Sequence, residues 1–317
     1  MSKYQVDPDL QPFLPVLPGV VDFSTQESIN AFWEKFAELN RSGESQTEKY
    51  DVSVENLNIS GLNGDPDIAL RIYRPAIEGS DKLPAIYEIH GGGFIIGDLD
   101  MQDAWCAFVA QSVGAVVVSV DYRLAPKDPY PAAPDDCYAG LLWLFENANE
   151  LGIDSARIAI SGQSAGACLA LSTTLRARDL NGPKVCFQLL EIPVVDDRLE
   201  TPSMLDFVDT PIWNLPNAQW GWKHYLSAVE GEIPAYASPA RSNDLSNLPS
   251  TYISTMEFDP LRDEGIELAT RLMQAKVPVE LHHYSGTFHG STIINTAESS
   301  KRITAHTLDA LKRHLTL

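Results

Sequence analysis

Short apolar runs and helical spacings alternate along most of this chain. Residues 67–75 (DIALRIYRP) alternate Ile68, Leu70 and Ile72 with Arg71 and Tyr73, as a half-buried strand does. Residues 83–90 (LPAIYEIH) and 114–122 (GAVVVSVDY) are nearly continuous apolar runs. Such runs predict strands that are buried on both faces.

From about residue 130 onward, predicted helices and strands take turns. This alternation predicts a mostly parallel sheet with helices on both faces, an α/β fold. The predicted helices cover 134–151, 164–178, 260–276 and 297–315, and the predicted strands cover 157–162, 185–195, 250–258 and 277–285.

Two segments break this rhythm. Residues 24–43 predict a helix with Ser24 as its N-cap and Gly43 at its end, behind a proline-rich start. Residues 197–235 are rich in aromatics and prolines and too long for a plain loop. We therefore expect cap segments at 1–45 and 197–235 over a core of 46–196 and 236–317; the alternative for 197–235 is a surface loop with one helix.

Composition and charge narrow the class of protein. The 317 residues are 44% hydrophobic and 21% charged, which is typical of a globular chain whose core needs no disulfide or metal. A net charge of −20 argues against nucleic acid and anionic lipid as partners. No signal peptide, membrane-length apolar run or metal-like spacing of Cys106, Cys137, Cys168 and Cys186 is visible. We expect a cytoplasmic enzyme that binds neither membrane nor metal.

The sequence SGQSAGA at 161–167 carries the first sign of chemistry. It contains G-x-S-x-G, with Ser164 between Gly162 and Gly166, after a predicted strand and at the start of a predicted helix. A nucleophile on such a tight turn has a strained backbone, and the two glycines keep the turn free of collisions. Ser164 is therefore the predicted nucleophile.

A serine hydroxyl needs a histidine base, and the base needs an acid to orient it. On this type of turn the acid and then the histidine follow the serine in the chain. His289 lies in a small-residue loop just after the last predicted strand, where a base can reach across the sheet. His282 and His283 lie in a predicted strand, and His306 and His314 lie in a predicted helix. His224 precedes most of the candidate acids, so we prefer His289 to all five.

The acid has several candidates. Asp259 ends the penultimate predicted strand, one strand-helix unit before His289, and is the preferred residue. Asp196 and Asp197 end the preceding strand and could also face the site, and Glu257 is a weaker candidate within its own strand.

Three consecutive glycines at 91–93 follow the strand LPAIYEIH. A tetrahedral intermediate carries negative charge on oxygen, and backbone N–H donors reach that oxygen only where side chains stay away. Gly92, Gly93 and Ala165 are the predicted oxyanion donors, with Gly91 supporting the turn and His90 a structural hydrogen-bonding residue. The rival, a dinucleotide-binding loop, needs G-x-G-x-x-G, which GGGFIIG misses by one place.

In order along the chain, the motifs HGGGF, DYRLAP (121–126), YPAAPDD (130–136), G-x-S-A-G and DPLRDEG resemble the hormone-sensitive-lipase-like family of bacterial esterases. The resemblance implies an α/β-hydrolase fold, with a mostly parallel eight-stranded sheet flanked by helices and a helical cap. It also implies hydrolysis of short- to medium-chain carboxylic esters without a cofactor. It assigns Ser164, Asp259 and His289 as the triad and Gly92, Gly93 and Ala165 as the oxyanion hole.

Two residues depart from the family pattern: Gln163 stands where an aspartate is usual, and Lys127 stands where a glutamate is usual. The first removes a charge beside Ser164 without changing the expected reaction class, and for the second we expect a small structural consequence. The alternatives are a catalytically silent small-ligand-binding protein on the same fold and a small-amide hydrolase. The expected partner is a small-molecule ester, and a homodimer is among the allowed assemblies.

Overall fold

The computed structural model describes residues 3–41, 46–77, 79 and 82–315. Eight strands form one sheet in the order β1-β2-β4-β3-β5-β6-β7-β8. Strand β2 is antiparallel to both of its neighbours, and the five pairings from β4 onward are parallel. The predicted mostly parallel eight-stranded sheet is confirmed. The strands are β1 Val52–Ile59, β2 Ile68–Pro75, β3 Leu83–Ile89, β4 Val116–Asp121, β5 Ile153–Gln163, β6 Phe187–Glu191, β7 Ser250–Phe258 and β8 Val279–Phe288.

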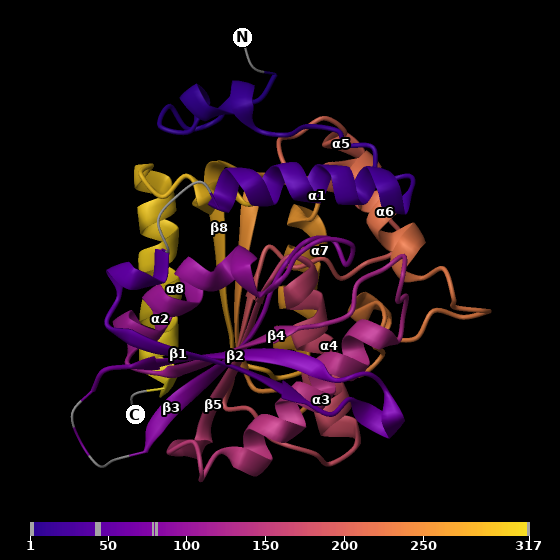
Figure 1. The fold of residues 1–317 in the computed structure, drawn as a ribbon. Helices are drawn as coiled ribbons and strands as arrows, with labels where there is room; N and C mark the ends of the chain where they lie inside the picture. The colour runs from indigo at the N-terminus through magenta and orange to yellow at the C-terminus, as the bar shows by residue number, and fades with distance from the viewer. Residues whose placement is uncertain (1–2, 42–45, 78, 80–81, 316–317) are drawn as a thin grey trace.

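Helices cover both faces of this sheet (Figure 1). Helices α2 (Asp103–Val113) and α8 (Glu298–Leu315) pack together on one face, and α3 (Ala132–Asn147) and α4 (Ala165–Asp179) pack together on the other. Helix α7 (Arg262–Gln274) packs on β7 and β8. The central strand β3 is buried from Pro84 to Ile89, as its apolar run predicts.

Helices α1 (Gln26–Arg41), α5 (Pro202–Asp206) and α6 (Leu215–Tyr225) lie together at one end of the sheet in Figure 1. The predicted N-cap of α1 is wrong by one residue. The side chain that accepts from the N–H of Ser28 is that of Thr25, not Ser24, because Thr25 lies three residues before that N–H. The predicted end at Gly43 lies outside the described residues.

The sequence prediction missed two elements, β1 and α2. In β1 only Ile59 is fully buried and Val54 is 41% exposed, so the strand lacks a clean apolar alternation. It forms because all eight of its residues pair with β2. Burial of Cys106, Cys137 and Cys168 agrees with their apolar surroundings in the sequence.

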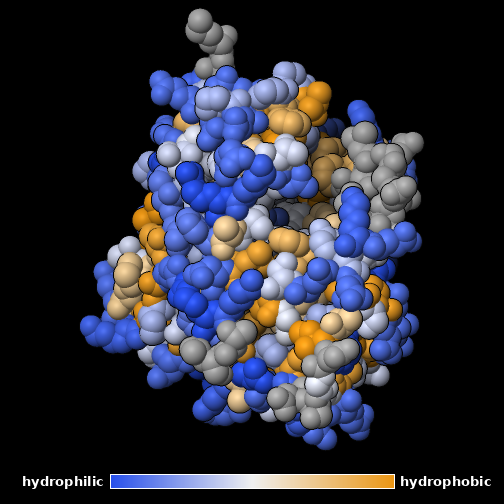
Figure 2. Space-filling view, turned by 90° about the vertical axis from the view of Figure 1, so that its left-hand side faces the viewer, coloured by the Kyte–Doolittle hydropathy of each residue, from blue (hydrophilic) through white to orange (hydrophobic). Residues whose placement is uncertain are grey.

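Hydrophilic residues predominate on the face shown in Figure 2, where hydrophobic residues lie in several separate groups. Among the described residues, no helix is both long and apolar enough to cross a membrane.

Candidate active site

Ser164 stands at the turn between β5 and α4 with φ 57° and ψ −118°, a region that non-glycine residues rarely adopt. Close contacts explain its neighbouring glycines. A Cβ on Gly162 would lie 2.3 Å from the carbonyl oxygen of Gly166, and a Cβ on Gly166 would lie 2.0 Å from that of Ile89. The backbone can make this sharp turn against β3 only without side chains at both positions.

Three side chains that are far apart in the sequence form one hydrogen-bonded chain. Nε2 of His289 lies 3.0 Å from Oγ of Ser164, and Nδ1 of His289 lies 2.8 Å from Oδ2 of Asp259. All three residues are at most 5% exposed. An ionised carboxylate only accepts hydrogen bonds, so Nδ1 carries the proton toward Asp259 and Nε2 is left to accept from the serine hydroxyl.

The sheet explains why these residues meet. Ser164, Asp259 and His289 each follow directly on the last residue of a strand, namely β5, β7 and β8. These strands are parallel, so their carboxyl ends lie at the same edge of the sheet. The N–H of Leu261 donates to Oδ1 of Asp259 at 2.9 Å, which fixes the second carboxylate oxygen.

The structure does not bring the other acid candidates to His289. Asp196 pairs with the guanidinium of Arg198, with both contacts at 2.7 Å. Asp197 pairs with Arg241. Glu257 accepts from the N–H of Gly286 at 2.6 Å.

The remaining downstream histidines have structural partners of their own. Nε2 of His224, on α6, lies 2.7 Å from the carbonyl oxygen of Phe23, so this residue ties α6 to the N-terminal segment. Of the other four, His282 contacts Glu280 and His283 contacts Thr255. His306 contacts Tyr284, and His314 contacts the carbonyl oxygen of Ala310.

The glycine loop after β3 faces this serine. A Cβ on Gly91 would lie 2.9 Å from the carbonyl oxygen of Gln163, so the loop lies against the turn that holds Ser164. Gly92 has φ 114°, and a Cβ there would lie 2.0 Å from the Ile96 carbonyl oxygen. Among the backbone hydrogen bonds of turns, loops and helix caps in the described part of the chain, none has the N–H group of Gly92, Gly93 or Ala165 as its donor. They are therefore available as hydrogen-bond donors.

His90 supports the loop from below. Its ring is fully buried and stacks on Tyr122 at 4.2 Å between ring centroids. Burial lowers the pKa of His90 to about 4, so the ring is neutral and its Nδ1–H donates to the carbonyl oxygen of Gly91 at 2.7 Å. The Tyr122 hydroxyl donates to the His90 carbonyl at 2.9 Å. The predicted structural role of His90 is thus supported.

The motifs DYRLAP and YPAAPDD meet in an ion pair whose partners the sequence prediction did not identify. Arg123 donates through Nε and Nη2 to the buried carboxylate of Asp136, and its Nη2 also donates to Asp65 at 2.9 Å. The unusual Lys127 in the same loop has a side chain that is 86% exposed. Its consequence for the fold is therefore small, as expected.

Two buried carboxyl groups lie at the ends of central strands without a cationic partner among the described residues. Burial raises the pKa of Glu88 on β3 to about 8 and that of Glu191 on β6 to about 7. The side chain of Glu191 accepts from Thr307, and its carbonyl accepts from the N–H of Ser164 at 2.8 Å. The turn that carries Ser164 is thus anchored to β6.

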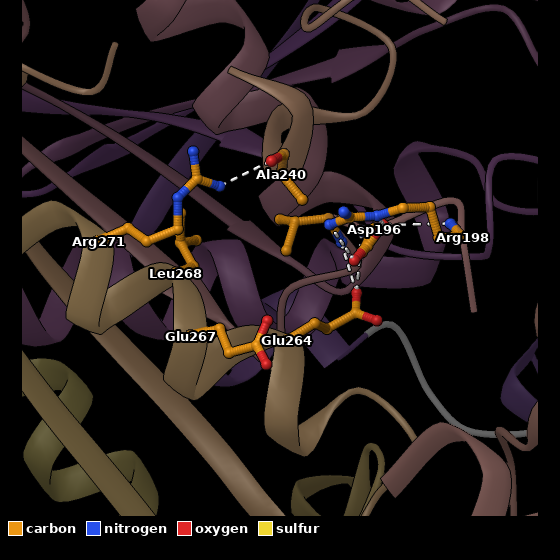
Figure 3. A pocket seen from close by; sticks show the side chains of 8 residues that line it. Asp196, Arg198, Ala240, Glu264, Glu267, Leu268 and Arg271 are labelled. Atoms are coloured by element: carbon orange, nitrogen blue, oxygen red, sulfur yellow. Dashed lines mark hydrogen bonds and ion pairs between the residues drawn. The ribbon is translucent and has the colours of Figure 1, made fainter. Parts of the chain in front are cut away.

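A pocket of about 250 Å³ lies beside α7 (Figure 3). Four of its charged side chains contact other parts of the protein: Arg198 pairs with Asp196, Arg271 donates to the Ala240 carbonyl, and Glu264 accepts from the N–H groups of residues 195 and 196. The charged side chain of Glu267 also lines the pocket. None of the lining residues is Ser164, Asp259 or His289. These contacts hold the chain after β6 against α7.

Comparison with known proteins agrees with this geometry. A family model described as the α/β-hydrolase fold matches residues 86–293. Esterase LipI of Mycobacterium tuberculosis (strain ATCC 25618 / H37Rv) is 37% identical over 291 residues, which are 91% of this chain and 88% of that protein. An ethyl acetate hydrolase of Pseudomonas putida is 32% identical over 83% of each chain.

Among solved structures, a bacterial heroin esterase superposes with a TM-score of 0.92 at 45% identity and 98% coverage of both chains. Esterase LipW of Mycobacterium marinum superposes with a TM-score of 0.89 at 36% identity, covering 98% of this chain and 96% of the other. The chain therefore belongs to the hormone-sensitive-lipase-like family of ester hydrolases, which have the α/β-hydrolase fold.

Proposed function

We propose that this ester hydrolase cleaves carboxylic esters through an acyl-enzyme on Ser164, with His289 as the base and Asp259 as the acid that orients it. The hydrogen-bonded chain from Ser164 through His289 to Asp259 is the observation that carries the proposal. A silent binding protein would not need this chain of contacts at a strained serine.

The first half of the reaction forms the acyl-enzyme. Oγ of Ser164 attacks the ester carbonyl carbon while Nε2 of His289 takes the hydroxyl proton. The N–H groups of Gly92, Gly93 and Ala165 donate to the oxygen that becomes negative. The intermediate collapses, the bond to the alcohol oxygen breaks, and His289 returns the proton to the leaving alcohol.

The second half releases the acid. A water molecule attacks the acyl carbon, His289 takes one of its protons, and the same N–H groups stabilise the second oxyanion. Collapse of this intermediate breaks the bond to Ser164 and returns the proton to its Oγ, so the products are a carboxylic acid and the free enzyme. No residue of the triad is consumed.

We assign residues 1–45 and 197–235 as the cap, over a core of 46–196 and 236–317. Hydrogen bonds join the two segments: the N–H of Ile212 donates to Pro18, and the N–H of Val21 donates to the side chain of Asn217. A cap of this kind bounds the substrate pocket and excludes water from it. We propose short- to medium-chain acyl esters as substrates.

Hydrolysis of p-nitrophenyl esters from acetyl to decanoyl tests the proposal, with Ser164→Ala as the matched control. We expect kcat of the variant to fall by at least about 10⁴-fold, because the nucleophile is lost. Each buried methylene contributes about 0.8 kcal/mol, or roughly fourfold in kcat/KM, so preference should rise with acyl length and level off between butyryl and hexanoyl. Comparable activity of the Ser164→Ala variant would refute the mechanism, and a preference rising past octanoyl would refute the substrate class.

A further inference from the structure

Trp213, in the proposed cap segment 197–235, lies against the glycine loop. A Cβ on Gly93 would lie 2.4 Å from Cη2 of the indole, so the ring edge rests directly on the backbone of Gly93. The ring centroid of Trp213 is also 6.1 Å from that of His289. One side chain therefore borders both the loop proposed to hold the oxyanion and the base.

In the proposed mechanism the alcohol side of the reacting carbon faces His289, which the indole borders. The leaving oxygen must come within hydrogen-bond reach of Nε2 of His289, because that atom supplies its proton. A group attached to that oxygen would therefore lie near His289 and within reach of the indole. The acyl chain leaves the same carbon by a different bond and does not have to pass this ring.

Hydrogen bonds hold the backbone of the loop that carries Trp213. The Thr210 hydroxyl donates to the Trp213 carbonyl at 2.6 Å. Fully buried Asn217 donates through Nδ2 to the carbonyl oxygens of Ile212 and Gly19, both at 3.2 Å. Ile212 has φ 67°, a left-handed conformation that a β-branched residue adopts only when its surroundings impose it.

We propose that Trp213 limits the size of the alcohol group that the enzyme accepts, and that Asn217 positions Trp213 by tying its loop to the N-terminal segment. The inference rests on the proposed function, because it assumes that His289 protonates the leaving alcohol. Under this proposal Trp213 governs selectivity for the alcohol group of the ester, and other parts of the pocket wall govern selectivity for the acyl group.

Two ester series test the role of Trp213. One keeps the acetyl group and enlarges the alcohol through ethyl, phenyl and 1-naphthyl acetate, and the other keeps p-nitrophenol and lengthens the acyl chain from acetyl to hexanoyl. The variants are Trp213→Leu and Trp222→Leu. Trp222 is the matched control because it is similarly buried but packs on Phe94 and Tyr225 instead of Gly93.

For Trp213→Leu we expect the ratio of kcat/KM for 1-naphthyl over ethyl acetate to rise about tenfold or more, because one methylene of added room in a pocket already changes selectivity by about that factor. The acyl-length profile should keep its shape, and Trp222→Leu should change neither. Each ratio compares two substrates on one protein preparation, so a lower fraction of folded protein affects both rates equally and does not change the ratio. Trp213→Phe has a ring smaller than indole and larger than the leucine side chain, so its alcohol ratio should lie between those of the wild type and Trp213→Leu. An unchanged alcohol ratio, or a change confined to the acyl series, would overturn the inference.

Asn217 is tested by a double-mutant cycle. If it acts through Trp213, Asn217→Ala should raise the alcohol ratio in the wild-type background and leave it unchanged in the Trp213→Leu background. An equal rise in both backgrounds would overturn the positioning role. Failure of the proposed function has a separate signature, which is retained hydrolysis in Ser164→Ala.

Discussion

The replacement of Glu88 by glutamine should make the protein less sensitive to alkaline pH. Glu88 is 3% exposed on the central strand β3 and stands between Ser119 and Ser161 on the neighbouring strands. Burial raises its pKa from 4.5 to about 8, with a further contribution from Glu191 and an opposing one from a hydrogen bond to Ser161. The folded protein therefore favours the protonated carboxyl.

The direction of the pH effect follows from proton counting. Between pH 4.5 and about 8 the folded chain holds a proton at Glu88 that the unfolded chain has lost. Stability from this group is complete below pH 4.5 and is lost as the pH rises toward 8. The difference between 4.5 and about 8 corresponds to an upper limit of about 5 kcal/mol. Glutamine has the same shape and no charge, so Glu88→Gln should remove this loss.

Urea unfolding at pH 5 and pH 8.5 measures the effect. Between pH 5 and pH 8.5, the unfolding free energy of the wild type should fall by at least about 2 kcal/mol more than that of Glu88→Gln. This amount is below the upper limit because water penetration and structural relaxation reduce the cost of burying a charge. The exposed Glu55 on β1 provides the control, since Glu55→Gln should keep the wild-type pH dependence. Equal pH dependence of wild type and Glu88→Gln would show that the Glu88 carboxyl is not held protonated by the fold.

Three further substitutions separate the proposed roles at the site. Asp259→Asn should lower kcat for p-nitrophenyl butyrate by on the order of a thousandfold or more, because His289 loses the carboxylate that sets its tautomer. Asp196→Asn should lower kcat by less than about tenfold. The reverse order would show that the acid is Asp196 and not Asp259. Gly93→Ala forces a Cβ to within 2.4 Å of the Trp213 ring at φ 59°, so the donor shifts and kcat should fall about 10²–10³-fold. Circular dichroism would verify its fold, and near-normal kcat in a folded variant would exclude Gly93 as an oxyanion donor.

Local patterns predicted much of the sheet and the meeting of Ser164, Asp259 and His289. Parallel strands buried on both faces have continuous apolar runs, as in β3 and β4, and Ser164, Asp259 and His289 each directly follow a strand of this sheet. Strand order along the chain then limits which acid and which histidine can reach the serine. This is why reading the motifs in sequence singled out Asp259 over Asp196.

Features that depend on tertiary contact had no local signal. Strand β1 is an edge strand with weak alternation, so only its pairing with β2 defines it. The Arg123–Asp136 pair joins residues 13 positions apart across a loop and a helix start. The contact of Trp213 with Gly93 joins two segments whose approach no spacing encodes.

The N-terminal segment is more tightly integrated than its proline-rich sequence suggests. Leu10 and Ile29 are at most 1% exposed, and the N–H of Asp7 donates to the Gly286 carbonyl at 2.8 Å. Deletion of residues 1–45 would expose apolar surface as well as open the pocket. Point substitutions such as Asn217→Ala are therefore the cleaner probes of its part in substrate choice.

Covalent labelling tests the central claim, an acyl-enzyme on Ser164, most directly. The protein is treated with an organophosphate, and residual esterase activity is followed together with intact-protein and peptide mass spectrometry. The account predicts complete inactivation with one phosphoryl group per chain, on the peptide that contains Ser164, and no adduct on the Ser164→Ala variant. Full activity without an adduct, or inactivation with the adduct on another residue, would contradict it.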